Sequence, residues 1–304
     1  MQKQNKLRNR SLKYSIFWPV VFIAPFIIFY LVFNIYPLLY SLRISFYKWD
    51  GIGEQIFVGI KNYTDIITKD PNFWKAFGNT LIIIIITYHI AIFLGLIIAS
   101  FLRSLTQGVQ FFQTVNFLPY ITTPVAIGLI FSFLFDWKSG IVNSVVQLLV
   151  GTGPHWLGEA WTARLVIAFM IGWKYIGYYM ALYLAGITSI SEELYEAAKV
   201  DGAGVIQTFV KITIPMLKPI TMFIVMTSII GGLQLFDEPN LLFPATLFGG
   251  PEKSCLTMVA HFYDVSFMST SRLGYGTAVA FSLFMIIVVF SVCGNFMMKR
   301  KAED

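Results

Sequence analysis

The sequence of 304 residues is poor in charge, because only 12% of its residues are Asp, Glu, Lys or Arg, against about 25% in a typical soluble domain. Its two cysteines, Cys255 and Cys293, have no disulfide-framework or metal spacing, and its three histidines form no zinc motif. The basic residues are scattered along the chain, which argues against a nucleic-acid partner. A hydrophobic content of 57% excludes a disordered chain. A membrane protein is the class that remains.

Charge is almost absent from six long stretches, and a helix needs about 20 mostly apolar residues to cross a bilayer. The stretches are 14–42, 76–102, 104–135, 165–191 (interrupted only by Lys174), 219–236 and 273–298. Inside lipid, backbone polar groups must be satisfied within the segment, which favours helices. The stretches also lack the alternation of barrel strands. The sequence predicts an all-α integral membrane protein with about six transmembrane helices.

The distribution of Lys and Arg predicts the orientation of these spans. Basic residues are about twice as dense in the segments that lie inside if both termini are cytoplasmic as in the outer loops. The first span is longer than the apolar part of a signal peptide and is expected to remain as an anchor. We therefore expect a cytoplasmic segment 1–15, a transmembrane domain 16–298 with a cytoplasmic loop 189–219, and a cytoplasmic tail 299–304.

The cytoplasmic loop 189–219 has the pattern of two helices separated by a turn. Ser189 and Glu192 form a capping-box pattern, which predicts a helix start. Leu194, Ala197 and Ala198 would share one face of this helix, and small alanines allow close approach of another protein. Glycines follow and break the helix. The pattern alone fits an ordinary amphipathic connector as well as a docking site.

This loop resembles the E-A-A loop of the membrane subunits of bacterial ABC importers. The matching residues are Glu196, Ala197, Ala198, Asp201, Gly202, Ala203, Ile212 and Pro215. Ile214 stands where leucine is usual in the family. The surrounding L-Y-E-A-A and F-V-K-I-T-I-P segments are similar to those of maltose-type and lactose-type sugar permeases. The resemblance extends from about the first span to the last.

The resemblance implies a type I ABC importer permease fold in the bacterial inner or plasma membrane. The loop would be a coupling element that docks on an ATPase, with Glu196 as its polar contact, the alanines as close contacts and Gly202 as the turn. The sequence has no G-x-x-x-x-G-K-[ST] phosphate-binding motif. The chain is therefore expected to bind no cofactor and to have no enzymatic activity, while two partner ATPase subunits bind ATP and Mg. A second, related permease subunit in a heterodimer and an extracytoplasmic sugar-binding protein complete the expected assembly.

The same resemblance implies a carbohydrate pathway, with an oligosaccharide as the expected cargo. Carbohydrate sites combine apolar walls with a few placed polar groups. Trp173 and Tyr178 match the family's W-x-x-x-x-Y before the coupling loop. Thr227 and Gln234 stand where the maltose permease has Ser and Asn, whereas Gly231 replaces another Asn. Packing and interfacial anchoring are the alternatives for these aromatic residues.

Lys174 lies inside a predicted span, where charge is costly. It can line the pathway or extend its amine to the outer surface, and the sequence does not decide between the two. Asp237 and Glu238 are expected at the outer mouth as solvated helix-end residues. His89 is expected to pack by a hydrogen bond rather than to relay protons.

An ion-coupled secondary transporter of small polar solutes is the alternative function. Such a transporter uses intramembrane carboxylates, and the six stretches contain no acidic residue. An intramembrane enzyme would need a catalytic motif such as H-E-x-x-H, which is absent. Neither alternative explains the E-A-A pattern.

Overall fold

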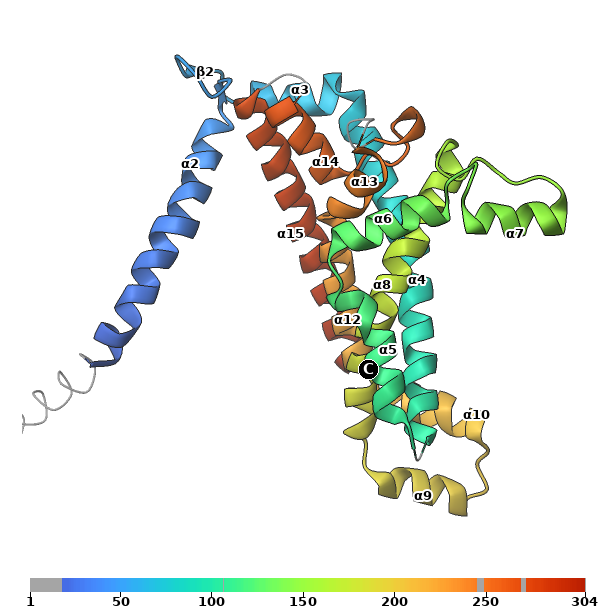
Figure 1. The fold of residues 1–304 in the computed structure, drawn as a ribbon. Coiled ribbons are helices and arrows are strands. Elements are labelled where there is room, and N and C mark those ends of the chain that lie inside the picture. Colours follow the sequence, from blue (N-terminus) through green and yellow to red (C-terminus); the bar gives the residue numbers. More distant parts are fainter. Residues whose placement is uncertain (1–17, 106, 245–248, 269–271, 304) are drawn as a thin grey trace, which may run out of the picture.

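The structure, a computed structural model, describes residues 18–105, 107–244, 249–268 and 272–303. Within these ranges the chain is almost entirely helical (Figure 1). After the first span, Trp18–Ile44, which includes η1(Leu31–Ile35) and α2(Tyr36–Ile44), the elements are β1(Tyr47–Lys48), β2(Ile56–Phe57), α3(Lys61–Lys69), α4(Pro71–Ser104), α5(Val109–Ile121), α6(Pro124–Leu134), α7(Ile141–Val150), α8(Ala160–Thr188), α9(Glu192–Val200), α10(Val205–Thr208), η2(Phe209–Thr213), α11(Ile214–Met216), α12(Lys218–Leu233), α13(Asp237–Leu242), η4(Pro251–Lys253), α14(Met258–Tyr263), η5(Asp264–Met268) and α15(Leu273–Glu303). The all-α membrane class predicted from the sequence is confirmed. The predicted N-terminal segment 1–15 lies outside the described residues.

In the described part of the chain, four helices are long and apolar enough to cross a membrane, and the number rises to six if each of two bent helix pairs forms one span. One bent pair is α5 with α6, which meet at 94°. Thr122 and Thr123 have extended backbones between them, because a residue that precedes proline avoids the helical conformation. The expected third span is therefore broken before Pro124, while Pro119 remains inside α5. The other pair, Val205–Met216 with α12, is bent by 63°.

The core is built on the contact between α4 and α8, which run along each other. Gly95 of α4 lies against Tyr179 of α8, and a methyl group added there would come within 2.8 Å of the Tyr179 Cβ. Gly232 similarly brings α12 against Ile84 and Tyr88 of α4. Small residues let transmembrane backbones approach closely, and close packing is what holds helices together in lipid. These glycines therefore determine where the spans cross.

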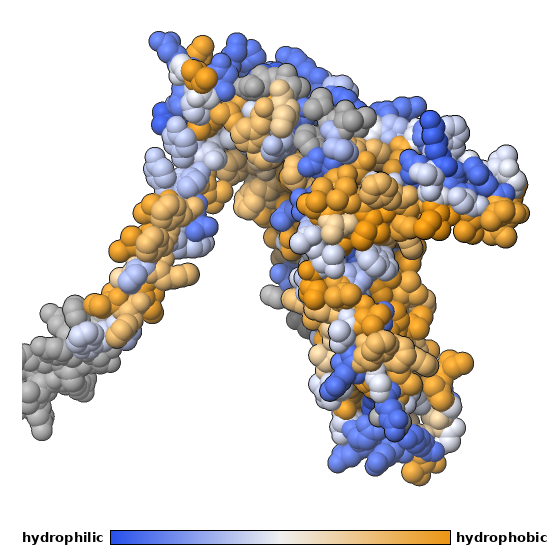
Figure 2. Space-filling view, viewed as in Figure 1, coloured by the Kyte–Doolittle hydropathy of each residue, from blue (hydrophilic) through white to orange (hydrophobic). Residues whose placement is uncertain are grey.

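The surface shows a broad apolar band between two polar ends (Figure 2). One polar end carries α9 and α10, and the opposite end carries α3 and α14 (Figure 1). The first span stands away from the other helices over most of its length, and α2 contacts α15 and β1. Its exposed side chains include Phe22 (78%) and Phe26 (70%), which suits a segment surrounded by lipid or by another apolar helix.

The loops at the end opposite α9 are tied to the spans by polar contacts. Arg164 of α8 donates to the Ser254 carbonyl at 3.0 Å and to Oδ1 of Asn79 at 2.8 Å. The Asn79 amide donates in turn to the carbonyls of Lys253 and Leu256. Because α4 and α8 hold the same loop, the segment from Lys253 to Leu256 is fixed to the helix pair that forms the core.

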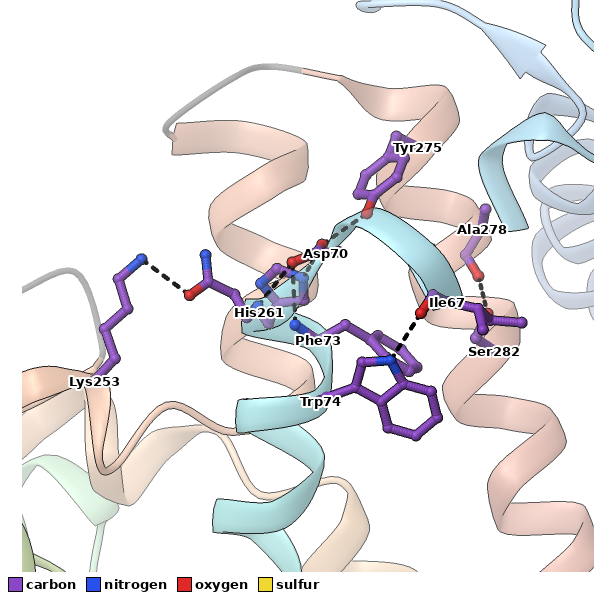
Figure 3. A network of polar contacts seen from close by, with 10 residues as sticks. Ile67, Asp70, Phe73, Trp74, Lys253, His261, Tyr275, Ala278 and Ser282 are labelled. Carbon is purple, nitrogen blue, oxygen red and sulfur yellow. Dashed lines mark hydrogen bonds and ion pairs between the residues drawn. The ribbon is translucent and has the colours of Figure 1, made fainter. Parts of the chain in front are cut away.

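Asp70 joins three helices at this end (Figure 3). Its carboxylate accepts from the backbone N–H groups of Asn72 and Phe73 as the N-cap of α4, lies 2.9 Å from Nε2 of His261 in α14 and accepts from the Tyr275 hydroxyl of α15 at 2.6 Å. Burial opposes ionisation of Asp70, but the hydrogen bonds from His261, Tyr275 and Phe73 outweigh it and hold its pKa well below the ordinary value. The carboxylate therefore stays charged and acts as a fixed tie.

We expect Asp70→Ala to lower the free energy of unfolding by about 2–4 kcal/mol, because it removes a helix cap and two hydrogen bonds to a charged group. A depressed pKa contributes stability above the ordinary carboxyl pKa and loses it only as pH falls through the folded value. Lowering the pH from 7 to 5 should therefore leave the contribution of this carboxylate intact.

Thermal denaturation of purified protein at both pH values measures this loss. Asp65→Ala is the matched control, because Asp65 forms an i,i+4 pair with the exposed Lys69 at 2.7 Å, and surface pairs of this kind contribute little to stability. Equal effects of the two substitutions would contradict a stabilising role of the Asp70 carboxylate between α4, α14 and α15.

Candidate functional site

The helix predicted in the loop 189–219 is present as α9, at one polar end of the molecule (Figure 1). It begins at Glu192 with Ser191 as its N-cap, so the predicted capping box of Ser189 and Glu192 is wrong. Ser189 instead caps the end of α8, where its hydroxyl donates to the Gly186 carbonyl at 2.7 Å. The helix starts later than predicted because α8 continues through Thr188.

The end of α9 is a Schellman motif. The Ala203 N–H donates to the Ala198 carbonyl at 2.9 Å, and the Gly202 N–H donates to the Lys199 carbonyl at 3.1 Å. Gly202 has φ +76°, the left-handed conformation that closes such motifs and that glycine adopts without steric cost. The D-G-A part of the pattern is therefore a rigid reversal that ends α9 and turns the chain toward α10.

The motif residues divide into an exposed set and an inward-facing set. Glu196, Ala197 and Asp201 are exposed, whereas Ala198 is only 8% exposed. Ala198 packs inside its own chain, so Ala197 is the exposed alanine of the E-A-A pattern. Tyr195, three residues before Ala198, faces inward with it at 8% exposure. The inward face of α9 is thus formed by Tyr195 and Ala198, while Leu194 and Ala197 are exposed.

The outer side of the loop exposes apolar residues. Val200 and Val205 are each 88% exposed, and Ile206 is 80% exposed, around the Gly202 turn. An open hollow of the surface is lined by Gly204, Val205, Ile206, Gln207, Val210 and Lys211. Contiguous exposed apolar residues rimmed by polar ones typically mark an interaction site.

The segment that returns to the membrane is irregular. A π-helical turn, η2, follows α10, and α11 leads into α12. Ile212 is half-buried and Pro215 is exposed at this entry. Such π-turns occur frequently at functional sites, and this one lies between the exposed loop and a spanning helix.

One of the predicted pathway residues of α8, Tyr178, belongs to a cluster of tyrosines. The Tyr178 ring stacks on Tyr120 of α5, with centroids 4.6 Å apart and planes 15° apart. Tyr175 contacts both rings at 6.4 and 5.6 Å, and Tyr88 of α4 contacts Tyr175 and Tyr179. Trp173 lies apart from this cluster, 5.7 Å from Phe131 of α6. The cluster therefore joins α4, α5 and α8.

Lys174 forms a buried ion pair. Its Nζ lies 3.0 Å from Oε1 of Glu238, and the two side chains are 11% and 9% exposed. The side chain of Lys174 therefore does not extend to the outer surface. Glu238, in the short helix α13, is not a solvated helix-end residue, whereas its neighbour Asp237 is exposed. The pair holds α13 against α8, because each charge is otherwise costly to bury.

Thr227 and Gly231 lie one turn apart on the same face of α12, and Gln234 follows as the C-cap residue of that helix. Gly231 and Gln234 are exposed, and no atom lies within 4 Å of a methyl group added at Gly231. The Thr227 hydroxyl is occupied by the carbonyls of Phe223 and Ile224. The exposed polar group of these three residues is therefore the Gln234 amide.

Sequence reasoning missed Tyr120, Glu238 and Arg103 as contact residues of the site. Tyr120 stacks on Tyr178 from another helix, Glu238 pairs with a residue 64 positions away, and Arg103 contacts α9 from α4. The prolines at 119 and 124 were a signal that the backbone near Tyr120 is irregular. Nothing in the sequence indicates the partners of Glu238 and Arg103.

The part of the chain that the structure describes contains no candidate metal or disulfide centre. No group of three or more His, Cys, Asp or Glu side chains is placed to hold a metal ion there. Cys255 and Cys293 are free thiols, and burial raises the pKa of the Cys255 thiol to about 11, which suits an inert structural cysteine. His89 bonds within its own helix to the Ile85 carbonyl at 3.0 Å.

Comparison with known sequences gives a match over most of the chain. Residues 91–300 match the model of a family described as "Binding-protein-dependent transport system inner membrane component". The arabinooligosaccharides transport system permease protein AraP of Bacillus subtilis is 33% identical over 276 residues, which are 90% of this chain and 86% of AraP. The lactose transport system permease protein LacF of Rhizobium radiobacter is 34% identical over 273 residues, 89% of this chain and 90% of LacF.

The fold is similar to that of solved structures. A chain of a bacterial ABC transporter involved in the import of the acidic polysaccharide alginate matches with a TM-score of 0.80 and 22% identity over 99% of both chains. A chain of a bacterial alginate ABC transporter in complex with an alginate pentasaccharide-bound periplasmic protein also has a TM-score of 0.80, with 21% identity over 97% of this chain and 96% of that chain. The similarity confirms the predicted permease fold.

Proposed function

The chain belongs to the family of binding-protein-dependent transport system inner membrane components, and we propose on that basis that it is the permease subunit of an ABC importer for a carbohydrate, with an oligosaccharide as its cargo. It is a multi-pass inner-membrane protein of the transport subunit class. Relatives whose names specify arabinooligosaccharides and lactose, each at least 33% identical, support the class of cargo.

The observation that carries the proposal is the E-A-A segment, which forms an exposed turn at one end of the molecule. Glu196, Ala197 and Gly202 are exposed, and exposed apolar side chains surround them. We propose that two ATPase subunits supply the ATP and Mg and that one of them receives this turn. ATP binding would then favour one of two arrangements of the spans through its differential contacts with the turn.

The other parts of the assembly follow from the same role. We propose a second, related permease as the partner that completes the pathway, and an extracytoplasmic sugar-binding protein as the donor of the cargo. The C-terminus would then be cytoplasmic, since α15 runs from the end with α3 and α14 toward the end with α9 and α10 (Figure 1), and we propose the same side for the N-terminus.

Reconstitution tests this function. The chain would be co-expressed with its neighbouring permease and ATPase genes, purified, and placed in liposomes with the sugar-binding protein inside or outside. We expect the ATPase to co-purify and sugar-loaded binding protein to stimulate ATP hydrolysis with sugar uptake. Failure of the ATPase to co-purify would contradict the assembly.

For the pathway, we expect Gln234→Ala to lower the rate of sugar uptake about tenfold, the effect of one lost hydrogen bond to the cargo. Trp173→Ala should lower uptake through lost ring contact. Val225→Ala is the matched control, because Val225 lies on the opposite face of α12 and is also exposed (37%). Uptake rate and sugar affinity are measured in the same liposomes, and wild-type values in both Trp173→Ala and Gln234→Ala would exclude this pathway.

The buried carboxylate of Glu238 does not support the alternative function of an ion-coupled secondary transporter. Glu238 is paired with Lys174 at 3.0 Å, so its charge is neutralised within the protein. A proton- or ion-coupling carboxylate would need to be free in one state of the cycle. The family match favours the importer.

A further inference from the structure

Arg103 occupies the last turn of α4 and reaches the E-A-A helix. Its Nη2 donates to Oε2 of Glu192 at 2.7 Å, and its Cζ lies 3.6 Å from the centroid of the Tyr195 ring. One guanidinium thus makes an ion pair and stacks on an aromatic face. Arginine can do both because it is planar and delocalised, whereas the lysine ammonium is a point charge.

Tyr195 connects this contact to a third element. Its ring is buried at 8% exposure, and its hydroxyl lies 3.2 Å from Oγ1 of Thr213. Thr213 is 5% exposed and is the last residue of η2, just before the chain enters α11 and α12. Arg103, Tyr195 and Thr213 therefore form a continuous connection from α4 through α9 to the base of α12.

The connection matters because α4 is not a sequence neighbour of α9. The chain joins α9 directly to α8 on one side and, through α10 and η2, to α12 on the other. Arg103 is 89 residues away from Glu192. Yet α4 packs along α8 and against α12 and contributes Tyr88 to the tyrosine cluster. Through this contact, a movement of α9 would be transmitted to the C-terminal end of α4.

We propose that Arg103 is a positioning residue for energy coupling, which seats α4 on Tyr195 so that displacement of the E-A-A helix moves α4 together with α8 and α12. The proposal rests on the proposed function, in which α9 receives the movement of an ATPase. Arg103 itself touches neither nucleotide nor sugar. Its contact with Tyr195 determines whether a movement of the docked helix α9 is transmitted to α4.

The stack, not the ion pair, carries the connection. The Glu192 side chain is 68% exposed, and exposed ion pairs contribute little because solvent screens them. The Tyr195 ring, in contrast, is desolvated, and cation–π contacts gain strength when water is excluded. Substitutions at Glu192 and at Tyr195 should therefore have different effects.

The experiment uses the full transporter in liposomes and measures ATP hydrolysed per sugar imported. We expect Arg103→Ala to raise this ratio about fivefold, the shift produced by losing one desolvated cation–π contact, while the amount of co-purified ATPase and its KM for ATP stay at wild-type values. Arg103→Lys should give an intermediate ratio, because it keeps the charge but cannot stack. Glu192→Gln should stay near wild type.

Two further variants test the pairing directly. Tyr195→Ala should raise the ratio like Arg103→Ala, and the double variant should be no worse than either single variant. Lys199→Ala is the matched control, because Lys199 is another basic residue that lines the same cavity of about 380 Å³ beside Arg103 and Tyr195. Its ratio should not change.

The outcomes separate this proposal from the function on which it rests. A wild-type chain that recruits no ATPase would contradict the proposed function. A wild-type transporter that works, with an unchanged ratio in Arg103→Ala, would overturn the positioning role alone. Loss of the ATPase from Arg103→Ala and Arg103→Lys would show that Arg103 serves docking or local folding instead, which also overturns it.

Discussion

Replacement of Gly202 by aspartate is expected to abolish coupled transport while the protein still inserts in the membrane. Gly202 is exposed, and no atom of this chain lies within 4 Å of a methyl group added there. The chain itself has room for the side chain, so the expected loss arises where the proposed ATPase subunit would close over the turn. A charge left unpaired in an interface costs about 2 kcal/mol or more, which predicts at least about a 30-fold loss of uptake.

Two controls separate docking from backbone strain at Gly202. Its φ of +76° disfavours most residues with a side chain, but asparagine tolerates this conformation. Gly202→Asn therefore keeps the shape without the charge and should retain more uptake than Gly202→Asp. Gly204→Ala, at a φ of −72° that any residue adopts, adds one methyl group to the lining of the hollow and should retain more uptake than Gly202→Asp. Normal uptake by Gly202→Asp, with the protein in the membrane, would refute the coupling role.

Replacement of Lys174 by methionine is the second large effect that we expect, this time on stability. Methionine fills a similar volume but leaves the Glu238 side chain, which is 9% exposed, buried without its partner. Removing one member of a buried ion pair costs about 3–5 kcal/mol. The midpoint of thermal denaturation of the purified protein should fall accordingly, and so should its abundance in the membrane.

The double variant decides whether the ion pair is the cause. Lys174→Met with Glu238→Gln removes both charges and should recover most of the lost stability, because replacing a buried ion pair with neutral groups is often nearly neutral. Lys174→Arg, which keeps the charge, should be milder than Lys174→Met. If the double variant is as unstable as Lys174→Met, the pair does not hold α13 on α8.

The fold could be predicted from the sequence to the level of helices and spans. A spanning segment must be apolar and must satisfy its backbone hydrogen bonds internally. Its location can therefore be predicted from a local property of the sequence, the absence of charged residues. The exception was the third span, which α5 and α6 divide at 94°. A proline such as Pro124 can end a helix or kink one that continues, so the residue alone does not set the angle, and α6 packs against α13 in the structure.

The coupling loop was predictable in its motif but not in its orientation. The pattern placed a helix, a glycine turn and a return segment in the right order. It did not show that Ala198 faces inward with Tyr195, because a short helix with apolar residues on several sides has more than one possible buried face. In the structure the inward face carries Tyr195, whose ring centroid lies 3.6 Å from the Arg103 Cζ.

The sequence by itself determined the class of protein, the approximate spans, the family and the order of helix, glycine turn and return segment in the loop 189–219, since all of these depend on residues close together in the chain. Only the tertiary structure decided the partners of Lys174, Tyr178 and Arg103. Each partner, Glu238, Tyr120 or Tyr195, lies on another element. A charge or ring within a span must find its contact across a helix interface, and the crossing of helices at glycines such as Gly95 and Gly232 determines which residues meet.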